Sequence, residues 1–201
     1  MILKDLLKWG ERIMKSKKEI RKEILQKRDL ICEEDKKHMD EKIFNELINC
    51  EQYKNSNTIF AFVSFKSEVD TYKFIEYAIS QGKTVGVPKI IKEEKHMEVF
   101  KINSLSDLEN GYFGVMEPVE GCEKINKEQI DFILMPGAVF DEKGGRIGYG
   151  GGFYDKFLSD VKNSVPKIAI AYELQLIENV PMDNYDIKID GIITEKRKII
   201  F

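Results

Sequence analysis

The stretch from Arg146 to Asp155 concentrates residue types that bind phosphate and metal ions. It reads Arg146-Ile-Gly-Tyr-Gly-Gly-Gly-Phe-Tyr-Asp155, five residues beyond an apolar segment that ends at Phe140 and before one with helical spacing. Glycines let a ligand approach the backbone, and a helix N-terminus presents free N–H groups to a phosphate. Arg146 supplies a forked donor for phosphate oxygens, and Asp155 can hold a magnesium ion beside them. The segment predicts a phosphate site.

The same segment also allows a purely structural interpretation. A flexible glycine loop can precede an ordinary helix, with Asp155 only complementing the helix dipole. The Walker pattern GxxxxGK[ST] is absent, and the glycine run matches GxGxxG only loosely. Neither a P-loop enzyme nor a Rossmann enzyme follows from the segment.

A second candidate cluster lies in residues 15–28, which hold seven Lys or Arg residues and two Glu residues. Lys17 and Arg21 are four residues apart and share one helix face, so together they can clamp phosphates. A solvated basic face is the alternative, and an RNA-binding helix is a third. The net charge of −3 and the absence of aromatic residues within this cluster argue against RNA.

The histidine and cysteine content argues against several other chemistries. There are two histidines, His38 and His96, and three scattered cysteines without a CxxC spacing: Cys32, Cys50 and Cys122. Histidine-dependent triads, zinc sites and a disulfide framework are therefore disfavoured.

The elements that must position these residues follow from hydrophobic periodicity. The chain has 201 residues, 42% of them hydrophobic, which is enough for one domain with a real core. Helices are expected over residues 2–14, 16–28, 34–50, 71–81 and 152–162, the second opened by the capping box Ser16-Lys-Lys-Glu19. Strands are expected over residues 58–65, 83–90, 96–102, 130–137, 167–172 and 190–195.

Alternating strands and helices predict an α/β fold, a mostly parallel sheet with helices on both faces and an N-terminal helical segment before it. Ligands of such folds bind at the carboxyl ends of the strands, so the loops after residues 65, 137 and 172 should carry the chemistry. We expect residues 1–15 to form a helical extension and residues 16–201 a single catalytic domain. No apolar run spans a bilayer, and charge at Lys4 and Asp5 interrupts any signal peptide, so a cytoplasmic monomer is expected.

The glycine segment, extended from Pro136-Gly-Ala-Val-Phe-Asp141 to Leu158, resembles the signature of the 5-formyltetrahydrofolate cyclo-ligases, also called 5,10-methenyltetrahydrofolate synthetases. The likeness runs from about residue 16 to residue 195. Three further stretches match in order: Lys17-Lys-Glu-Ile-Arg21, Ser64-Phe-Lys-Ser-Glu-Val-Asp-Thr71 and Gly114-Val-Met-Glu-Pro118.

The resemblance implies ATP-dependent closure of 5-formyltetrahydrofolate to 5,10-methenyltetrahydrofolate, with release of ADP and phosphate. ATP phosphorylates the formyl oxygen, and N10 of the folate then attacks the activated carbon. This reaction needs positioning and charge neutralisation rather than a Ser, Cys or His nucleophile. A non-catalytic nucleotide- or folate-binding protein on the same scaffold is the alternative, although the charged residues expected of the enzyme are all present.

The resemblance also implies roles for individual residues. It assigns Arg21, Arg146 and Tyr154 to catalysis. It assigns ATP binding to Lys17, Lys18, Glu19, Ile20, Arg21, Arg146, Ile147, Gly148, Tyr149, Gly150, Gly151, Gly152, Phe153 and Tyr154. It assigns folate binding to Phe65, Asp70, Tyr149, Gly150, Gly151, Gly152 and Phe153.

Phe65 would stack on the pterin and Asp70 would accept from its polar edge. Their structural alternatives are a strand-end aromatic residue and the cap of the helix over 71–81. Magnesium is the implied cofactor, with Asp155 and Asp190 as its ligands. The family usually has Tyr where Phe153 stands and often has His where Tyr185 stands.

Overall fold

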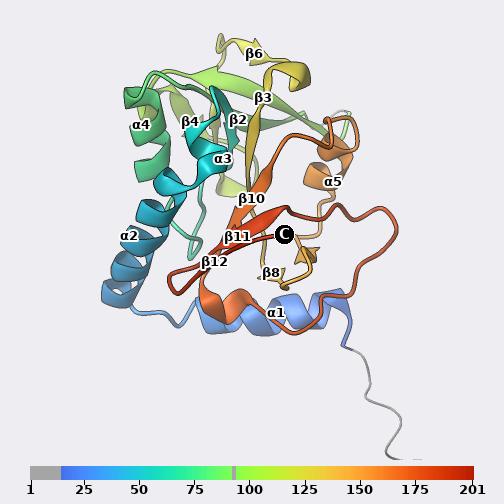
Figure 1. Ribbon diagram of the computed structural model, residues 1–201. Helices are drawn as coiled ribbons and strands as arrows, with labels where there is room; N and C mark the ends of the chain where they lie inside the picture. The colour runs from blue at the N-terminus through green and yellow to red at the C-terminus, as the bar shows by residue number, and fades with distance from the viewer. Residues whose placement is uncertain (1–14, 92–93) are drawn as a thin grey trace, which may run out of the picture.

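The fold is built on an eight-stranded sheet with the order β12-β11-β10-β7-β1-β2-β3-β6 (Figure 1). The computed structural model describes residues 15–91 and 94–201. The central strands β11, β10, β7, β1 and β2 pair in parallel, whereas β12, β3 and β6 join antiparallel. The predicted mostly parallel sheet is confirmed. Its strands are β1 (Thr58–Ala61), β2 (Thr84–Ile91), β3 (His96–Ile102), β6 (Lys124–Ile125), β7 (Phe132–Met135), β10 (Lys167–Ile170), β11 (Gly191–Ile193) and β12 (Lys198–Ile200).

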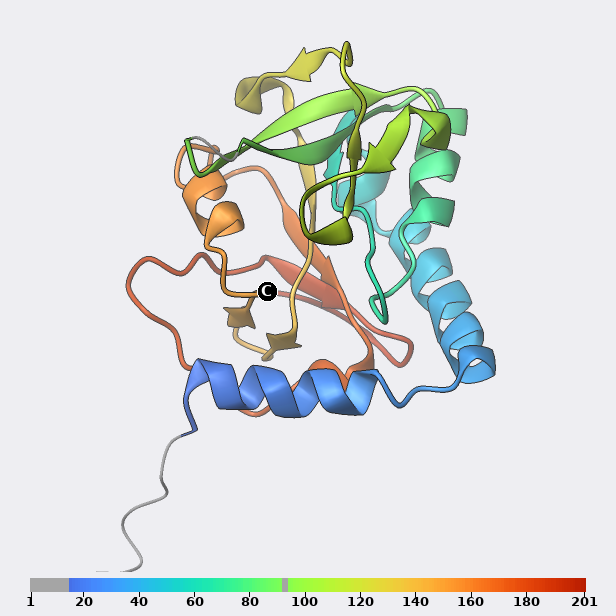
Figure 2. The same cartoon turned by 180° about the vertical axis from the view of Figure 1, so that it is seen from behind.

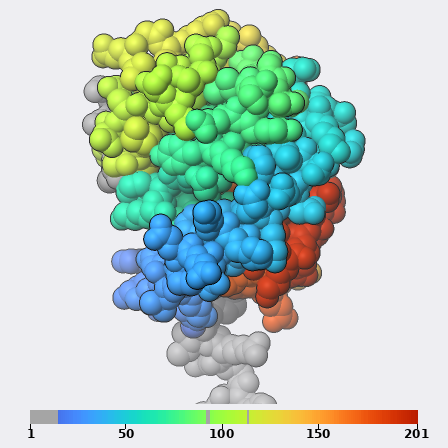
Figure 3. Space-filling view, turned by 90° about the vertical axis from the view of Figure 1, so that its left-hand side faces the viewer, coloured from blue at the N-terminus to red at the C-terminus, as the bar shows by residue number. Residues whose placement is uncertain are grey.

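Helices cover both faces of this sheet, as predicted. Successive side chains of β1 point to opposite faces of the sheet. Ile59 and Ala61 pack under α2 and α4, whereas Phe60 packs against α5. Figure 3 looks onto the first of these faces, where α2 and α4 close over the sheet. The helices are α1 (Lys17–Arg28), α2 (Glu33–Asn49), α3 (Glu51–Lys54), α4 (Tyr72–Ser80) and α5 (Phe153–Leu158).

Helix α1 lies across one end of the sheet and faces the β-hairpin formed by β8 (Val139–Phe140) and β9 (Arg146–Ile147) (Figure 2). Its Ile24 packs with Val139 and Ile147 in a small apolar cluster. The hairpin follows the carboxyl end of β7, so α1 runs past the edge where ligands of parallel sheets bind. A second hairpin, β4 (Leu108–Asn110) and β5 (Met116–Pro118), lies beside β2.

The local sequence patterns predict most helices and strands, and the predicted and observed elements differ mainly at their ends. The capping box is confirmed, since the Ser16 side chain accepts from the Glu19 N–H and the Glu19 carboxylate accepts from the Ser16 N–H. The strand predicted over 58–65 ends at Ala61, because the chain then turns to bond with the start of α4: the Ser64 N–H donates to Thr71 Oγ1 at 2.8 Å.

The helix predicted over 152–162 is shorter than expected and ends at Leu158. The helix predicted over 2–14 lies outside the described residues. Within the described ranges, no helix combines the length and the apolar character needed to cross a bilayer.

Candidate functional site

A cavity of about 880 Å³ opens at the carboxyl ends of β1 and β7, between α1 and the glycine segment. Most of the residues singled out in the sequence line it. They are Lys17, Arg21, Phe65, Arg146, Ile147, Gly148, Tyr149, Gly150, Gly151, Gly152, Phe153, Tyr154 and Asp155. The fold therefore brings together three predicted stretches that are far apart in the sequence.

The β8–β9 hairpin is fixed by the buried Asp141, whose carboxylate accepts hydrogen bonds from the Gly145 N–H and the Val180 N–H, each at 2.7 Å. This anchor sets the direction in which Arg146 enters the cavity wall. After β9 the chain becomes the glycine loop, residues 148–152. Gly150 has a φ of 100° and Gly152, the N-cap of α5, a φ of 68°, a region that residues with a Cβ rarely adopt.

Buried Arg146 and partly exposed Asp155 form an ion pair at the base of this loop. Arg146 is only 5% exposed, and its Nη2 donates to Asp155 Oδ1 at 2.8 Å. The same oxygen accepts the Ile187 N–H at 3.2 Å. The Arg146 fork is thus partly engaged by protein, but its Nε–H is buried with no hydrogen-bond partner among the described residues. A buried donor without a partner is costly, so it marks a place where a ligand oxygen fits.

On α1, Arg21 and Lys17 line the cavity. The three residues between them, which were also predicted to bind ATP, do not. Arg21 Nε donates to the Gly148 carbonyl at 2.7 Å. Its Nη1 lies beside Gly150, 3.2 Å from the position that a Cβ on that glycine would take. Lys17 is instead held by carboxylates, at 2.6 Å from Asp183 and in a close contact with Asp186.

The other residues of the predicted α1 stretch point away from the cavity. Lys18 and Glu19 are exposed, and Glu19 belongs to the capping box. Ile20 packs in the apolar cluster under α1. The prediction that their side chains contact ATP is not supported by their placement.

Of the predicted folate residues outside the glycine segment, Phe65 lines the cavity and Asp70 does not. Phe65 lines the cavity, with its ring close to Gly114. Asp70 is not part of the lining, and its Oδ1 accepts the Tyr72 N–H at 3.1 Å. Asp70 therefore bonds the first N–H of α4 from the position before the N-cap, which is Thr71.

Asp155 lines the cavity, whereas Asp190, the other predicted magnesium ligand, is not among the lining residues. Asp190 lies at the amino end of β11, where its carboxylate accepts the Lys167 N–H at 2.8 Å and pairs with the Lys167 ammonium at 2.7 Å. The cavity is at the opposite, carboxyl edge of the parallel strands. Across residues 15–91 and 94–201, no three His, Cys, Asp or Glu side chains are arranged to hold a metal ion.

Asp155 by itself still suits a metal that arrives with a nucleotide. Mg²⁺ in nucleotide sites commonly uses one or two carboxylates, together with phosphate oxygens and water. Both hydrogen bonds to Asp155 use Oδ1, and the side chain is 23% exposed at the cavity wall. Its Oδ2 accepts no hydrogen bond within the described part of the chain and can face a cation.

The structure adds a network that sequence reasoning missed: Arg28, Tyr149 and Glu68. Arg28 Nη1 donates to the Tyr149 hydroxyl at 2.9 Å, and that hydroxyl donates to the Glu68 carboxylate in a close contact. Glu68 also accepts the Phe65 N–H at 2.8 Å. Arg28 follows Lys17 and Arg21 on the same face of α1, and Glu68 lies inside the matched 64–71 stretch, so both signals were present in the sequence.

Burial controls the ionisation of this network. It raises the pKa of the Glu68 carboxyl, against the lowering effect of the Tyr149 hydroxyl and the Phe65 N–H. Burial, followed by the charge of Glu68, raises the pKa of the Tyr149 phenol, which keeps it a donor at neutral pH. The phenol thus joins the glycine loop to the end of α1 and to the loop after β1.

Tyr154 forms part of the cavity wall beneath the loop. Its ring stacks on Phe60 with centroids 5.6 Å apart and planes 5° from parallel. Its hydroxyl is buried without a hydrogen-bond partner among the described residues, and burial raises its pKa. Tyr154 therefore presents a second unpaired donor besides Arg146 Nε.

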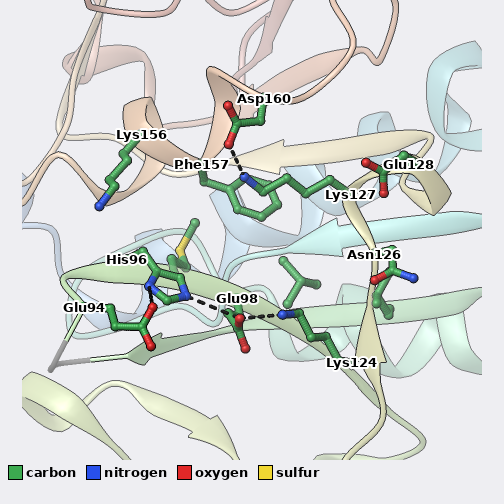
Figure 4. A pocket seen from close by; sticks show the side chains of 13 residues that line it. Glu94, His96, Glu98, Lys124, Asn126, Lys127, Glu128, Lys156, Phe157 and Asp160 are labelled. Atoms are coloured by element: carbon green, nitrogen blue, oxygen red, sulfur yellow. Dashed lines mark hydrogen bonds and ion pairs between the residues drawn. The ribbon is translucent and has the colours of Figure 1, made fainter.

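A second cavity, of about 490 Å³, is bounded by α5, β3 and β6 (Figure 4). Several of its charged side chains pair with one another. His96 lies 3.4 Å from Glu94 and 3.3 Å from Glu98, and Lys127 bonds Asp160 at 2.8 Å. It contains none of the predicted site residues, so the chemistry belongs to the first cavity.

Comparison with known proteins identifies the family of the chain. The model of the 5-formyltetrahydrofolate cyclo-ligase family matches residues 13–195. The chain belongs to the 5-formyltetrahydrofolate cyclo-ligase family. The resemblance seen in the glycine segment is thus confirmed over most of the chain.

Relatives of this cyclo-ligase family cover the chain almost completely. The chain is 28% identical to 5-formyltetrahydrofolate cyclo-ligase from Mus musculus, over 90% of this chain and 94% of the mouse protein. It is 32% identical to the Mycoplasma pneumoniae cyclo-ligase, over 90% and 99%. The NMR structure of Aquifex aeolicus 5,10-methenyltetrahydrofolate synthetase superposes with a TM-score of 0.82 at 35% identity, covering 92% of each chain. The predicted fold class is confirmed.

We predict that Asp155→Asn destabilises this cyclo-ligase by about 1–3 kcal/mol, because it leaves the buried Arg146 guanidinium without its carboxylate. Urea unfolding measures the change. Asp160→Asn is the matched control, since that side chain is 70% exposed and its pair with Lys127 lies at the surface. Equal effects of the two substitutions would show that the Arg146 pair does not stabilise the fold.

A second prediction concerns Glu68 and pH. Because the folded-state pKa lies above the ordinary value of 4.5, the stability that Glu68 contributes is complete below pH 4.5 and is lost as the pH rises through the folded-state pKa. We expect the unfolding free energy of the wild type, minus that of Glu68→Gln, to fall as the pH rises above about 4.5 in urea titrations. The exposed Glu34→Gln serves as control. A difference that grows with pH would contradict the burial argument.

Proposed function

We propose that this chain closes 5-formyltetrahydrofolate to 5,10-methenyltetrahydrofolate and converts ATP to ADP and phosphate. The observation that carries the proposal is the single cavity in which a phosphate-binding side, Arg21 with the glycine loop, faces an aromatic side that includes Phe65. The family membership and the relatives' names support the same activity. Both ligands of such a reaction need to occupy one cavity for a group to pass between them.

The proposed chemistry proceeds in two balanced steps. The formyl oxygen attacks the γ-phosphorus of ATP and ADP leaves, which turns a poor leaving group into a phosphate ester. The N10 lone pair then attacks the formyl carbon, the carbon–oxygen bond breaks, and phosphate departs with the former formyl oxygen as N10 loses its proton. Neither step needs an enzyme nucleophile, in agreement with the residues that line the cavity.

The protein's contribution is to hold donors where negative charge develops. The Arg21 guanidinium lies along the glycine loop, and the Arg146 Nε–H and the Tyr154 hydroxyl are the two buried donors without partners in the described part of the cavity wall. Prearranged donors in a site shielded from water stabilise a transferring phosphoryl group more than the same groups in water would. We assign these three residues to that role.

On the folate side, we propose that Phe65 stacks on the pterin. It follows the end of β1 at the carboxyl edge of the sheet, and Glu68 fixes its backbone through the Phe65 N–H. On the metal side, Asp155 would hold a magnesium ion that offsets phosphate charge, and Asp190 is not proposed again because it lies at the other edge of the sheet. The monomeric state and the cytoplasmic location stay predictions from the sequence.

The proposal is tested with purified protein, 5-formyltetrahydrofolate, ATP and Mg²⁺. We expect the near-ultraviolet absorbance band of the methenyl product to appear together with ADP, in equal amounts and only when both substrates are present. Binding of both ligands without this band would show a non-catalytic protein on the same scaffold. Folate-independent release of ADP would contradict the coupled reaction.

We predict that Arg21→Lys lowers kcat at least about tenfold while the KM for ATP changes less than about threefold. Lysine keeps the charge but loses the planar fork that reaches both the Gly148 carbonyl and the space beside Gly150. Steady-state kinetics measure both constants. Lys22→Gln, an exposed change on the same helix, should alter neither. If Arg21→Lys reduced only stability, Arg21 would be a structural residue.

We predict that Phe65→Ala raises the KM for the folate about 5- to 100-fold, the scale of base–aromatic stacking, and the KM for ATP much less. Phe65→Tyr keeps the ring and should retain most of the folate affinity. Equal increases for both substrates would mean that Phe65 supports the cavity as a whole rather than contacting the pterin.

A further inference from the structure

Tyr185 is an unusual side chain for the rim of this cavity. It is 74% exposed, yet it lines the cavity between Asp183 and Asp186. Its hydroxyl donates to Asp183 Oδ2 at 3.1 Å, and the Lys17 ammonium lies 5.8 Å from its ring centroid. The side chain is therefore held in place at its polar end while most of its surface stays open to solvent.

The charges around Tyr185 make this end of the cavity unsuitable for phosphate. The Lys17 ammonium lies over the ring, and both Asp183 and Asp186 bond it. One positive charge against two negative ones leaves an excess of negative charge, which repels phosphate oxygens. An uncharged aromatic ring meets no such repulsion and finds a π surface on which to stack.

Helix α1 orders the parts of the cavity along its length. Three basic residues follow one another on its inner face: Lys17, Arg21 and Arg28. Along the helix axis, Arg21 lies about 6 Å from Lys17 and Arg28 about 16 Å from it. Lys17 touches Tyr185, Arg21 touches the glycine loop, and Arg28 reaches the loop that carries Phe65, through Ser67. The phosphate-binding part thus lies between an aromatic residue at each end.

We propose that Tyr185 is the platform on which the nucleoside base of the co-substrate stacks. The inference rests on the proposed function, which places the transferred phosphoryl group at the glycine loop and the folate at Phe65. A nucleotide whose terminal phosphate points toward the folate must extend its base in the opposite direction, toward Tyr185. Lys17 then acts as a positioning residue that holds the 183–186 segment, rather than as part of a phosphate clamp.

Equilibrium binding separates a base platform from a phosphate contact. Isothermal titration calorimetry with ATP and with inorganic tripolyphosphate, both with Mg²⁺, is applied to the wild type, Tyr185→Ala and Tyr185→Phe. We expect Tyr185→Ala to weaken ATP about 5- to 100-fold and to leave tripolyphosphate within about twofold. Tyr185→Phe keeps the ring and should bind ATP within about twofold of the wild type. Leu30→Ala, at an exposed apolar residue beyond the other end of α1, is the control.

Two results would overturn the proposal. Unchanged ATP binding by Tyr185→Ala would show that the base lies elsewhere, and an equal loss of ATP and tripolyphosphate would show that Tyr185 acts through the charge of Lys17. Turnover of 5-formyltetrahydrofolate by the wild type, measured separately, keeps these failures distinct from a failure of the proposed function. A wild type that neither turns over nor binds ATP would overturn both.

Discussion

The ion pair between buried Arg146 and partly exposed Asp155 is the interaction on which the site depends. It joins β9 to α5 across the glycine loop, and its two residues also bond the Pro136 carbonyl and the Ile187 N–H. A loop of glycines has few side chains with which to hold itself, so its shape is imposed from both ends. Burying such a pair costs desolvation, and the geometry must be good to offset that cost. The pair thereby holds the glycine loop in a shape whose backbone a phosphate can approach closely.

Positive charge is concentrated at the centre of the cavity and is neutralised at its rim. Arg21, Arg28 and Arg146 bring guanidinium groups to the centre, near the glycine loop and Tyr149. At the rim, Lys17 is neutralised by two carboxylates beside Tyr185. Two aromatic ends and a cationic centre match two heterocyclic ligands that share one phosphoryl group. This arrangement explains why a single cavity suffices for the reaction and why no histidine is needed in it.

Local features of the site were predictable from the sequence, whereas pairings across the fold were not. The capping box and the mostly parallel sheet follow from short-range patterns and were confirmed, and the glycine segment leads into a helix as its spacing predicted. The partners of Lys17 and Tyr149 come from distant segments, so no local pattern reveals them. Asp190 is different, because it begins a parallel strand and therefore belongs at the amino edge of the sheet, away from the ligands. That signal was in the sequence.

The central claim is that phosphate leaves carrying the formyl oxygen of the folate. It is tested most directly with 5-formyltetrahydrofolate labelled with ¹⁸O in the formyl group, incubated with the protein, ATP and Mg²⁺ in unlabelled water. Mass spectrometry of the released phosphate should find one ¹⁸O atom for each methenyl product formed. Unlabelled phosphate accompanying the product would mean that ATP is hydrolysed by water and that the formyl oxygen is never phosphorylated.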